Sequence, residues 1–245
     1  MTVIPLYRQP SIHPQAAVCA ACAVRSSALF GALDDAGLDH IHTHIASVDL
    51  AADELVYARG SKGTAIYTLR CGVVRFERFN EEGERRVVRL AGPGDLIGQE
   101  ALLQQGHTDD AVACTPVQLC RIPTSLVTEL GEQQRPLQRE LMLRWQKALD
   151  EAEAWVTDLS TGSARQRLLR LLVRLAGYAE ADGPIWLPRR EEIGAMLDMS
   201  IETASRQVSQ LKREGVLTLE AGRRTLLDRA ALSRALATAT PDPVP

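Results

Sequence analysis

The sequence predicts a protein of the α+β class that consists of an antiparallel β-roll, one long helix and a small C-terminal module, in this order. Three observations indicate this arrangement. Short β-rich runs occupy residues 47–123, and eight of the 17 glycines lie between Gly60 and Gly106, as expected of a compact roll with many turns. A helical hydrophobic pattern follows Pro123. Near the C-terminus, two short amphipathic helices precede a predicted β-hairpin.

The β-rich runs supply the strands of the roll. Each is bounded by glycine, proline or acidic turn residues, and each is rich in Val, Ile, Leu or aromatic residues. The strands are expected over Glu54–Ala58, Ala65–Arg70, Val73–Phe79, Arg85–Leu90, Ala111–Thr115 and Val117–Ile122.

Length, composition and charge limit the function. The chain has 245 residues, 45% apolar and 24% charged, which is room for a sensor or enzyme domain and a smaller second domain. The net charge of −3 is unevenly spread, because residues 1–159 carry 15 Lys and Arg against 21 Asp and Glu, whereas residues 160–235 carry 13 against 9. A basic module on an acidic body is typical of proteins that bind nucleic acid through that module.

Targeting signals are missing from the sequence. Residues 1–13 lack the apolar core of a signal peptide, and no apolar run of 18 residues is present. We therefore expect a cytoplasmic protein that does not bind a membrane. The five cysteines are then expected to be thiols, redox switches or metal ligands rather than structural disulfides.

The stretch Pro188–Val216 is typical of a helix-turn-helix. Ser200 is a good N-cap for a second helix over Ile201–Arg213, on which we expect Ile201, Ala204, Val208 and Leu211 to be buried. The alternative is an ordinary amphipathic helix pair with a solvated polar face. The hairpin predicted after it, with two arginines at its turn, favours a winged helix-turn-helix that binds DNA.

This assignment predicts two sets of DNA contacts. Bases in the major groove are distinguished by their pattern of donors and acceptors, so the base contacts are expected from Glu202, Ser205 and Arg206. The expected contacts to the DNA backbone come from Arg189, Arg190, Ser200, Thr203, Arg223 and Arg224.

A long helix over Pro136–Ser160 is expected to join two copies of the chain. Apolar residues recur on it with the seven-residue repeat of a coiled-coil seam. The dimer interface is therefore expected to contain Leu141, Trp145, Ala148, Ala152, Trp155 and Leu159. The alternative is that the stripe packs on the roll, but a helix of about 25 residues, roughly 37 Å long, exceeds what a roll of this size needs.

The chain thus divides into five segments. Residues 1–28 form an arm with a cysteine pair, residues 29–135 the β-roll sensor domain, and residues 136–160 the dimerisation helix. Residues 161–236 form the winged helix-turn-helix domain, and residues 237–245 a disordered tail.

This order of domains resembles the CRP/FNR superfamily of transcription regulators, named after the cyclic-AMP receptor protein and the fumarate–nitrate reductase regulator. The resemblance covers nearly the whole chain, and its most specific parts are Gly94-Asp-Leu-Ile-Gly98 and Ser200-Ile-Glu-Thr-Ala-Ser-Arg206. It implies a cyclic-nucleotide-binding-like roll and a homodimer on double-stranded DNA. RNA polymerase is implied as a further partner.

The fumarate–nitrate branch is the more similar one. Its recognition helix has the form Glu-Thr-x-Ser-Arg, which Glu202, Thr203, Ser205 and Arg206 match. The resemblance therefore implies a palindrome with TTGAT-like half-sites, in which Glu202 accepts from a cytosine amino group and Arg206 donates to guanine. The cyclic-nucleotide branch is less similar, because Gln99 stands where its pocket has a glutamate, and Asp109 and Asp110 stand where it has the phosphate-binding Arg-Ser pair.

Three cysteines match ligands of the iron–sulfur cluster in the oxygen-sensing members. Cys19, Cys22 and Cys120 match, whereas the third ligand position is Ala28; Cys114 is a replacement if the fold brings it near. Three interpretations stay open: a cluster with an unusual ligand, a thiol–disulfide or thiol–metal switch, and cysteines without a sensing role. In the last case the signal is haem, nitric oxide, a small molecule or the amount of protein. Oxygen or redox state is the expected signal.

An enzyme is the rival class. Cys19 and Cys22 have the spacing of a thioredoxin-like site, but such a site needs a βαβ setting, and a proline-rich arm precedes them here. No Ser-His-Asp, Walker or glycine-rich nucleotide pattern is found in the sequence. We therefore expect a transcription regulator that is not an enzyme.

Overall fold

The computed structural model describes residues 18–19, 21–25, 28–32, 41–180 and 183–239. The rest of the predicted arm, and residues 240–245 of the predicted tail, lie outside the described residues. Residues 237 and 238 belong to the last helix, α8 (Arg229–Thr238), so the prediction of a tail from residue 237 was wrong. The helix continues because the side chain of Asp228 caps its start and the sequence RAALSRALAT holds no helix breaker.

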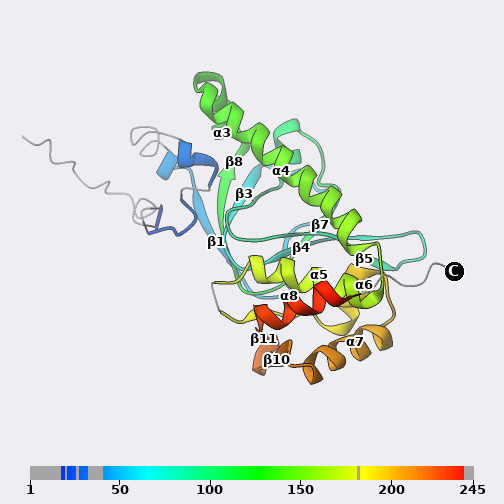
Figure 1. Ribbon diagram of the computed structural model, residues 1–245. Coiled ribbons are helices and arrows are strands. Elements are labelled where there is room, and N and C mark those ends of the chain that lie inside the picture. The colour runs from blue at the N-terminus through cyan, green and yellow to red at the C-terminus, as the bar shows by residue number, and fades with distance from the viewer. Residues whose placement is uncertain (1–17, 20, 26–27, 33–40, 181–182, 240–245) are drawn as a thin grey trace, which may run out of the picture.

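Two four-stranded antiparallel sheets form the roll (Figure 1). One has the order β1 (Ala46–Leu50), β8 (Val117–Pro123), β3 (Ala65–Cys71) and β6 (Leu96–Ile97). The other has the order β2 (Leu55–Tyr57), β7 (Asp110–Ala113), β4 (Val74–Phe79) and β5 (Arg85–Ala91). Inward-facing side chains such as Leu69, Phe76 and Leu119 pack between them.

All six β-rich runs predicted in the roll are strands, and two further strands of the roll, β1 and β6, were missed. β1 has only five residues, ASVDL, and its burial pattern is that of a half-exposed edge strand, so its short alternation of apolar and polar residues was not recognised. β6 has only two residues, which is too short for any pattern.

Helices follow the roll. They are α3 (Thr124–Gln133) and α4 (Arg135–Leu159), with Pro136 in the first turn of α4 as predicted. Short 3-10 turns occur at Leu29–Ala32 (η2) and Gln99–Leu103 (η3). Leu29 and Phe30 of η2 belong to one apolar cluster with Leu137 at the start of α4.

One side of α4 packs on its own chain. Trp155 and Leu159 are buried in the core shared with the C-terminal module, and Leu141 packs against the cluster around Leu137. The placement of Trp155 and Leu159 in the dimer seam was therefore wrong, because both side chains are covered within their own chain, whereas Leu141 and Ala148 are half-buried. The exposed apolar side chains of the helix are Met142, Leu143, Trp145, Leu149 and Val156.

The C-terminal module combines four α-helices with a small sheet. It comprises α5 (Ala164–Gly177), β9 (Ile185–Trp186), α6 (Arg190–Leu197), α7 (Ile201–Arg213), β10 (Leu217–Leu219), η4 (Ala221–Arg223), β11 (Arg224–Leu227) and α8. The sheet has the order β10-β11-β9. The predicted helix pair and hairpin thus form a winged helix-turn-helix.

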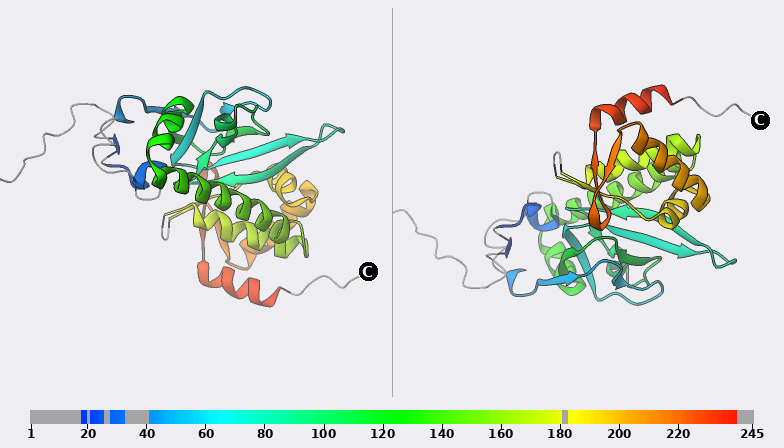
Figure 2. Two further views of the ribbon diagram at one scale, coloured as in Figure 1. Left: turned by 90° about the horizontal axis from the view of Figure 1, so that it is seen from above. Right: turned by 90° about the horizontal axis from the view of Figure 1, so that it is seen from below.

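This module packs directly on the roll. Both views in Figure 2 place the β4–β5 hairpin beside α6. A single apolar cluster contains Val87 and Leu90 of β5 together with Ile193 and Met196 of α6. No helix within the described ranges is long and apolar enough to cross a membrane.

Candidate nucleic-acid interface and thiol cluster

The turn between α6 and α7 depends on Asp198 and Ser200. Asp198 ends α6 in the left-handed conformation, with φ 52° and ψ 57°, which Asp adopts more readily than most residues. Ser200 then caps α7, because its hydroxyl accepts the backbone N–H of Thr203 at 3.2 Å. Arg167 of α5 fixes the same turn by donating to the backbone oxygens of Leu197 and Asp198.

The faces of α7 separate apolar from polar residues. Ala204, Val208 and Leu211 are buried as predicted, and they hold the helix on the module. Ile201 is 47% exposed, so its predicted burial was wrong. It stands in the first turn of α7, where the helix projects beyond α5, and it lines an open cleft instead.

The outer face of α7 carries the three predicted base-contact residues. Glu202, Ser205 and Arg206 are all exposed. The carboxyl of Glu202 has a lowered pKa because its own backbone N–H and the Ser200 hydroxyl donate to it. It is therefore an ionised acceptor, next to a hydroxyl and a guanidinium donor on the same face.

The arginines with the best-defined surroundings among the predicted DNA-backbone contacts fall into two groups. Arg189 and Arg224 have well-exposed side chains, at 59% and 66%. Arg223 instead pairs with the buried Glu192 and lies over the ring of Trp186, with 5.1 Å from its guanidinium carbon to the ring centroid. The two wing arginines therefore differ, and only Arg224 is presented to solvent.

The remaining three side chains predicted to contact the DNA backbone are partly buried or already hydrogen bonded within the protein. Burial lowers the pKa of Arg190, which is half-buried at the start of α6. The hydroxyls of Ser200 and Thr203 hydrogen bond to each other at 3.2 Å within the cap.

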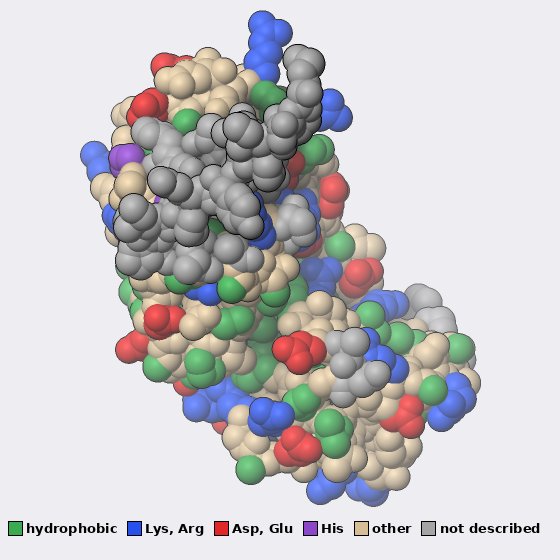
Figure 3. All heavy atoms as spheres, turned by 90° about the vertical axis from the view of Figure 1, so that its left-hand side faces the viewer, with side chains coloured by type: hydrophobic (Ala, Val, Ile, Leu, Met, Phe, Trp, Pro, Cys, Tyr) green, Lys and Arg blue, Asp and Glu red, His purple; other side chains and the backbone are tan. Residues whose placement is uncertain are grey.

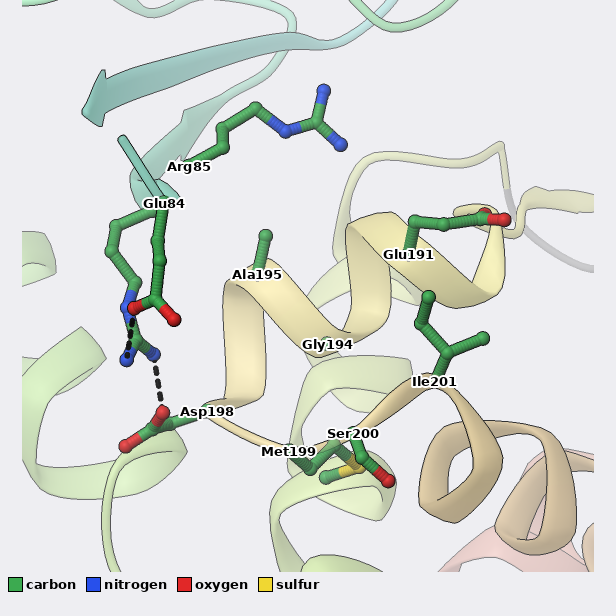
Figure 4. A pocket seen from close by; sticks show the side chains of 10 residues that line it. Glu84, Arg85, Glu191, Gly194, Ala195, Asp198, Met199, Ser200 and Ile201 are labelled. Atoms are coloured by element: carbon green, nitrogen blue, oxygen red, sulfur yellow. Dashed lines mark hydrogen bonds and ion pairs between the residues drawn. The ribbon is translucent and has the colours of Figure 1, made fainter. Parts of the chain in front are cut away.

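An open cleft separates the helix-turn-helix from the tip of the β4–β5 hairpin (Figure 4). Glu84 and Arg85 line the hairpin side, and Ser200 and Ile201 line the other. An ion pair of Arg86 with Asp198 closes one end of it. On the face of the molecule in Figure 3, which is the left-hand side of Figure 1, basic side chains lie at several separate places between acidic ones.

Known proteins share both halves of this architecture. The family model of the cyclic nucleotide-binding domain matches residues 47–134, and that of the Crp-like helix-turn-helix domain matches residues 166–235. The nitrogen fixation regulation protein FixK of Bradyrhizobium diazoefficiens is 30% identical over 225 residues, which are 89% of this chain and 94% of that protein. The chain belongs to the CRP/FNR family of transcription regulators.

Other members of the CRP/FNR family agree with this assignment. The transcriptional activator protein FnrL of Cereibacter sphaeroides is 28% identical over 218 residues, 85% of this chain and 87% of FnrL. The structure of FixK2 from Bradyrhizobium japonicum superimposes with a TM-score of 0.70 at 25% identity, covering 80% of this chain and 99% of that one. As a CRP/FNR regulator with a helix-turn-helix, the chain binds DNA and is not an enzyme.

The roll has a polar cluster where the cyclic-nucleotide branch of the family has its pocket. Gln99 is buried, and the ring of His107 stacks on Tyr57 with 3.8 Å between ring centroids. Asp109 is paired with Arg78, and Asp110 accepts the backbone N–H of Arg59 at 2.7 Å. Asp109 and Asp110, which the sequence comparison sets against the phosphate-binding pair, are thus carboxylates that already have partners within the protein.

Three thiols share one pocket at the arm end of the roll. Cys19, Cys22 and Cys120 line it together with Ala28 and Thr68. Burial raises the pKa of Cys120 to about 11, and the neighbouring thiols of Cys19 and Cys22 add to the increase. The prediction from the sequence that these cysteines belong together agrees with this pocket.

The donor set does not fit a four-thiolate cluster. Ala28 brings only a methyl group to the pocket, and Cys114, the suggested replacement, is buried in the other core beside Arg75. Among the described residues, no group of three or more Cys, His, Asp or Glu is arranged to hold a metal ion. Cys71 is exposed and lies outside the pocket.

Proposed function

We propose that this protein binds a two-fold symmetric DNA site with TTGAT-like half-sites as a homodimer. The observation that carries the proposal is the outer face of α7, where an ionised Glu202, the Ser205 hydroxyl and the Arg206 guanidinium are exposed side by side. Glu202 accepts from a cytosine amino group, and Arg206 donates to O6 and N7 of guanine. Arg189, Arg190 and Arg224 contact phosphates and position the helix, with the capping residues Ser200 and Thr203 beside them.

The partner copy is proposed to pack on α4. Met142, Trp145, Leu149 and Val156 are exposed at spacings of three, four and seven, which is the repeat of a two-stranded seam. Ala152 falls within the same stripe. This seam retains Trp145 and Ala152 from the sequence-based expectation and replaces the other four residues. A two-fold dimer matches a palindromic site.

Selection from random duplexes tests the DNA specificity. The wild-type protein is expected to enrich sites with two TTGA-containing halves about one helical turn apart. Arg206→Ala should reduce the free energy of DNA binding by about 1–3 kcal/mol and relax selection at the guanine. Arg224→Ala should weaken binding to all sequences alike and reduce its salt dependence. An enriched site without a TTGA-like half would reject the roles given to Glu202, Ser205 and Arg206.

We further propose that the thiol pocket makes DNA binding sensitive to redox state. The thiol of Cys19 or Cys22 and the thiol of Cys120 form a disulfide, and together they lose two protons and two electrons. Hydrogen peroxide accepts these protons and electrons and is reduced to two water molecules. The bond would fix the arm to β8. Because η2 follows the arm directly and packs against the start of α4, this constraint reaches the dimer helix and the spacing of the two recognition helices.

The redox proposal is tested with a Cys19→Ser, Cys22→Ser double variant. Promoter output with and without oxygen or peroxide should change in the wild type and stay constant in the double variant, while Cys71→Ser, which removes an exposed thiol outside the pocket, should behave as wild type. A double variant whose promoter output still changes with oxygen or peroxide, as in the wild type, would remove these cysteines from the mechanism. RNA polymerase is the proposed partner in such output, and related proteins are named transcriptional activators.

A further inference from the structure

A buried cluster of charges joins the roll to the DNA-binding module. At its centre, Arg75 of β4 donates from Nε to Glu77 at 2.8 Å and from Nη1 to Asp53 at 3.3 Å. The same Nη1 lies 3.5 Å from Oε1 of Glu192. Only 6% of the Arg75 side chain and 3% of the Glu192 side chain is exposed, so the pair is shielded from water and fixed in one arrangement.

Glu192 belongs to α6 and holds three parts of the protein together. Its Oε2 accepts the backbone N–H of Arg189 at 2.6 Å, which closes the start of α6, and it also pairs with Arg223 of the wing. Its Oε1 faces Arg75 of the roll. A buried charge that lost these partners would be costly, so the network specifies how the module sits on the roll.

At the edge of this network, one carboxylate of the roll reaches a predicted DNA contact. Asp53 Oδ2 lies 3.5 Å from Nη2 of Arg189, while its Oδ1 is held by Arg75. The backbone of Asp53 is anchored as well, because its N–H donates to the oxygen of Ala113 at 2.8 Å. The carboxylate is therefore held at the start of α6 by Arg75 and by its own backbone, while 43% of its side chain is exposed.

We propose that Asp53 is an internal competitor of DNA for Arg189, so that docking of the DNA-binding module on the roll lowers its affinity for DNA. A carboxylate and a phosphate use the same donors of a guanidinium. An Asp53 carboxylate that remains beside α6 would also repel a phosphate that approaches Arg189. Arg224, the other well-exposed arginine among the predicted phosphate contacts, has its ion pair within the wing, with Glu220 at 3.7 Å.

The inference rests on the proposed function, since it assigns Arg189 to a DNA phosphate. The further element is that the roll controls the contact between Arg189 and a DNA phosphate directly, through the carboxylate of Asp53. Any signal that shifts the roll away from α6 would release Arg189, and any signal that tightens the docking would withhold it. Asp53 thus links the sensor domain to DNA affinity through charge.

Asp53→Asn tests the proposal by removing the charge while retaining the turn. Asp53 has a φ of 69°, a left-handed conformation that asparagine also adopts readily. The matched control is Asp49→Asn, which changes the net charge of the roll equally at an exposed residue of β1. Binding to the selected palindrome is measured by fluorescence anisotropy over a series of salt concentrations, and each variant is repeated with Arg189→Ala.

Asp53→Asn is expected to tighten binding by roughly three- to tenfold, because it removes the negative charge that holds Arg189 and repels an approaching phosphate. The salt dependence should steepen by about one counterion. Asp49→Asn should stay within about twofold of wild type, and Arg189→Ala should abolish the gain from Asp53→Asn.

Equal effects of the two Asp variants, or a gain that persists without Arg189, would overturn the inference. A wild-type protein that binds no palindrome would instead reject the proposed function, and this outcome is visible before any variant is made.

Discussion

Leu149→Glu is expected to separate the dimer into single chains. Leu149 is 53% exposed in the protomer, so a partner can bury about half of its side chain. Complete burial of a leucine is worth about 1.5–3 kcal/mol, so half-burial in both copies contributes roughly 1.5–3 kcal/mol to the dimer. The substitution also places two carboxylates across an apolar seam, where loss of hydration costs several kcal/mol for each ion. The dissociation constant should therefore increase by at least about 100-fold.

Leu143→Glu is the matched control for this experiment. Leu143 lies on the same helix and is 51% exposed, but it falls outside the stripe of Met142, Leu149 and Val156. Sedimentation velocity over a range of concentrations should show a dimer for the wild type and for Leu143→Glu, and a single chain for Leu149→Glu. Equal dissociation by both variants, or a wild type that sediments as a single chain, would refute the placement of the seam.

Three further predictions concern the stability of the fold. Gly92→Ala should destabilise the protein by about 1–3 kcal/mol in chemical denaturation, because the new Cβ would lie 2.1 Å from the ring of Tyr178, whereas Gly177→Ala, with no atom within 4 Å, should not. Arg167→Ala should cost about 1–3 kcal/mol and weaken DNA binding, since it leaves the carbonyl groups at the end of α6 without their donor. Burial raises the pKa of Cys114 from 9.0 to about 12, so the native state keeps a proton that the unfolded chain releases between these values. Stability that is fully present below pH 9.0 should therefore fall as the pH rises towards about 12, and Cys114→Ala should reduce this loss in denaturation curves at neutral and alkaline pH.

Local signals in the sequence predicted the helix-turn-helix well. Ser200 as a cap and the stripe of Ala204, Val208 and Leu211 fixed both the bounds of α7 and its outward face, because these features depend on residues three or four positions apart. The tolerance of Asp198 for a left-handed turn is likewise a property of one residue.

Features that depend on distant parts of the chain were harder to predict. The heptad on α4 was recognised, but a helix with two apolar stripes does not say which stripe faces its own core, and Trp155 was assigned to the wrong one. The wing arginines are adjacent and chemically identical, and only the position of Glu192 in the fold distinguishes Arg223 from Arg224. The pairing of Asp53 with Arg189 joins residues 136 positions apart, for which the sequence holds no signal.

The apolar cluster that unites the roll with the C-terminal module has a consequence for folding. Val73, Val87 and Leu90 of the roll share this cluster with Leu172 and Ile193 of the module, so neither part completes its interior alone. A chain cut between α4 and α5 would expose apolar surface on both fragments. We therefore expect the two parts to unfold together in a single melting transition. Exchanging the DNA-binding half for another would then require matching changes in the residues of the roll on which it packs.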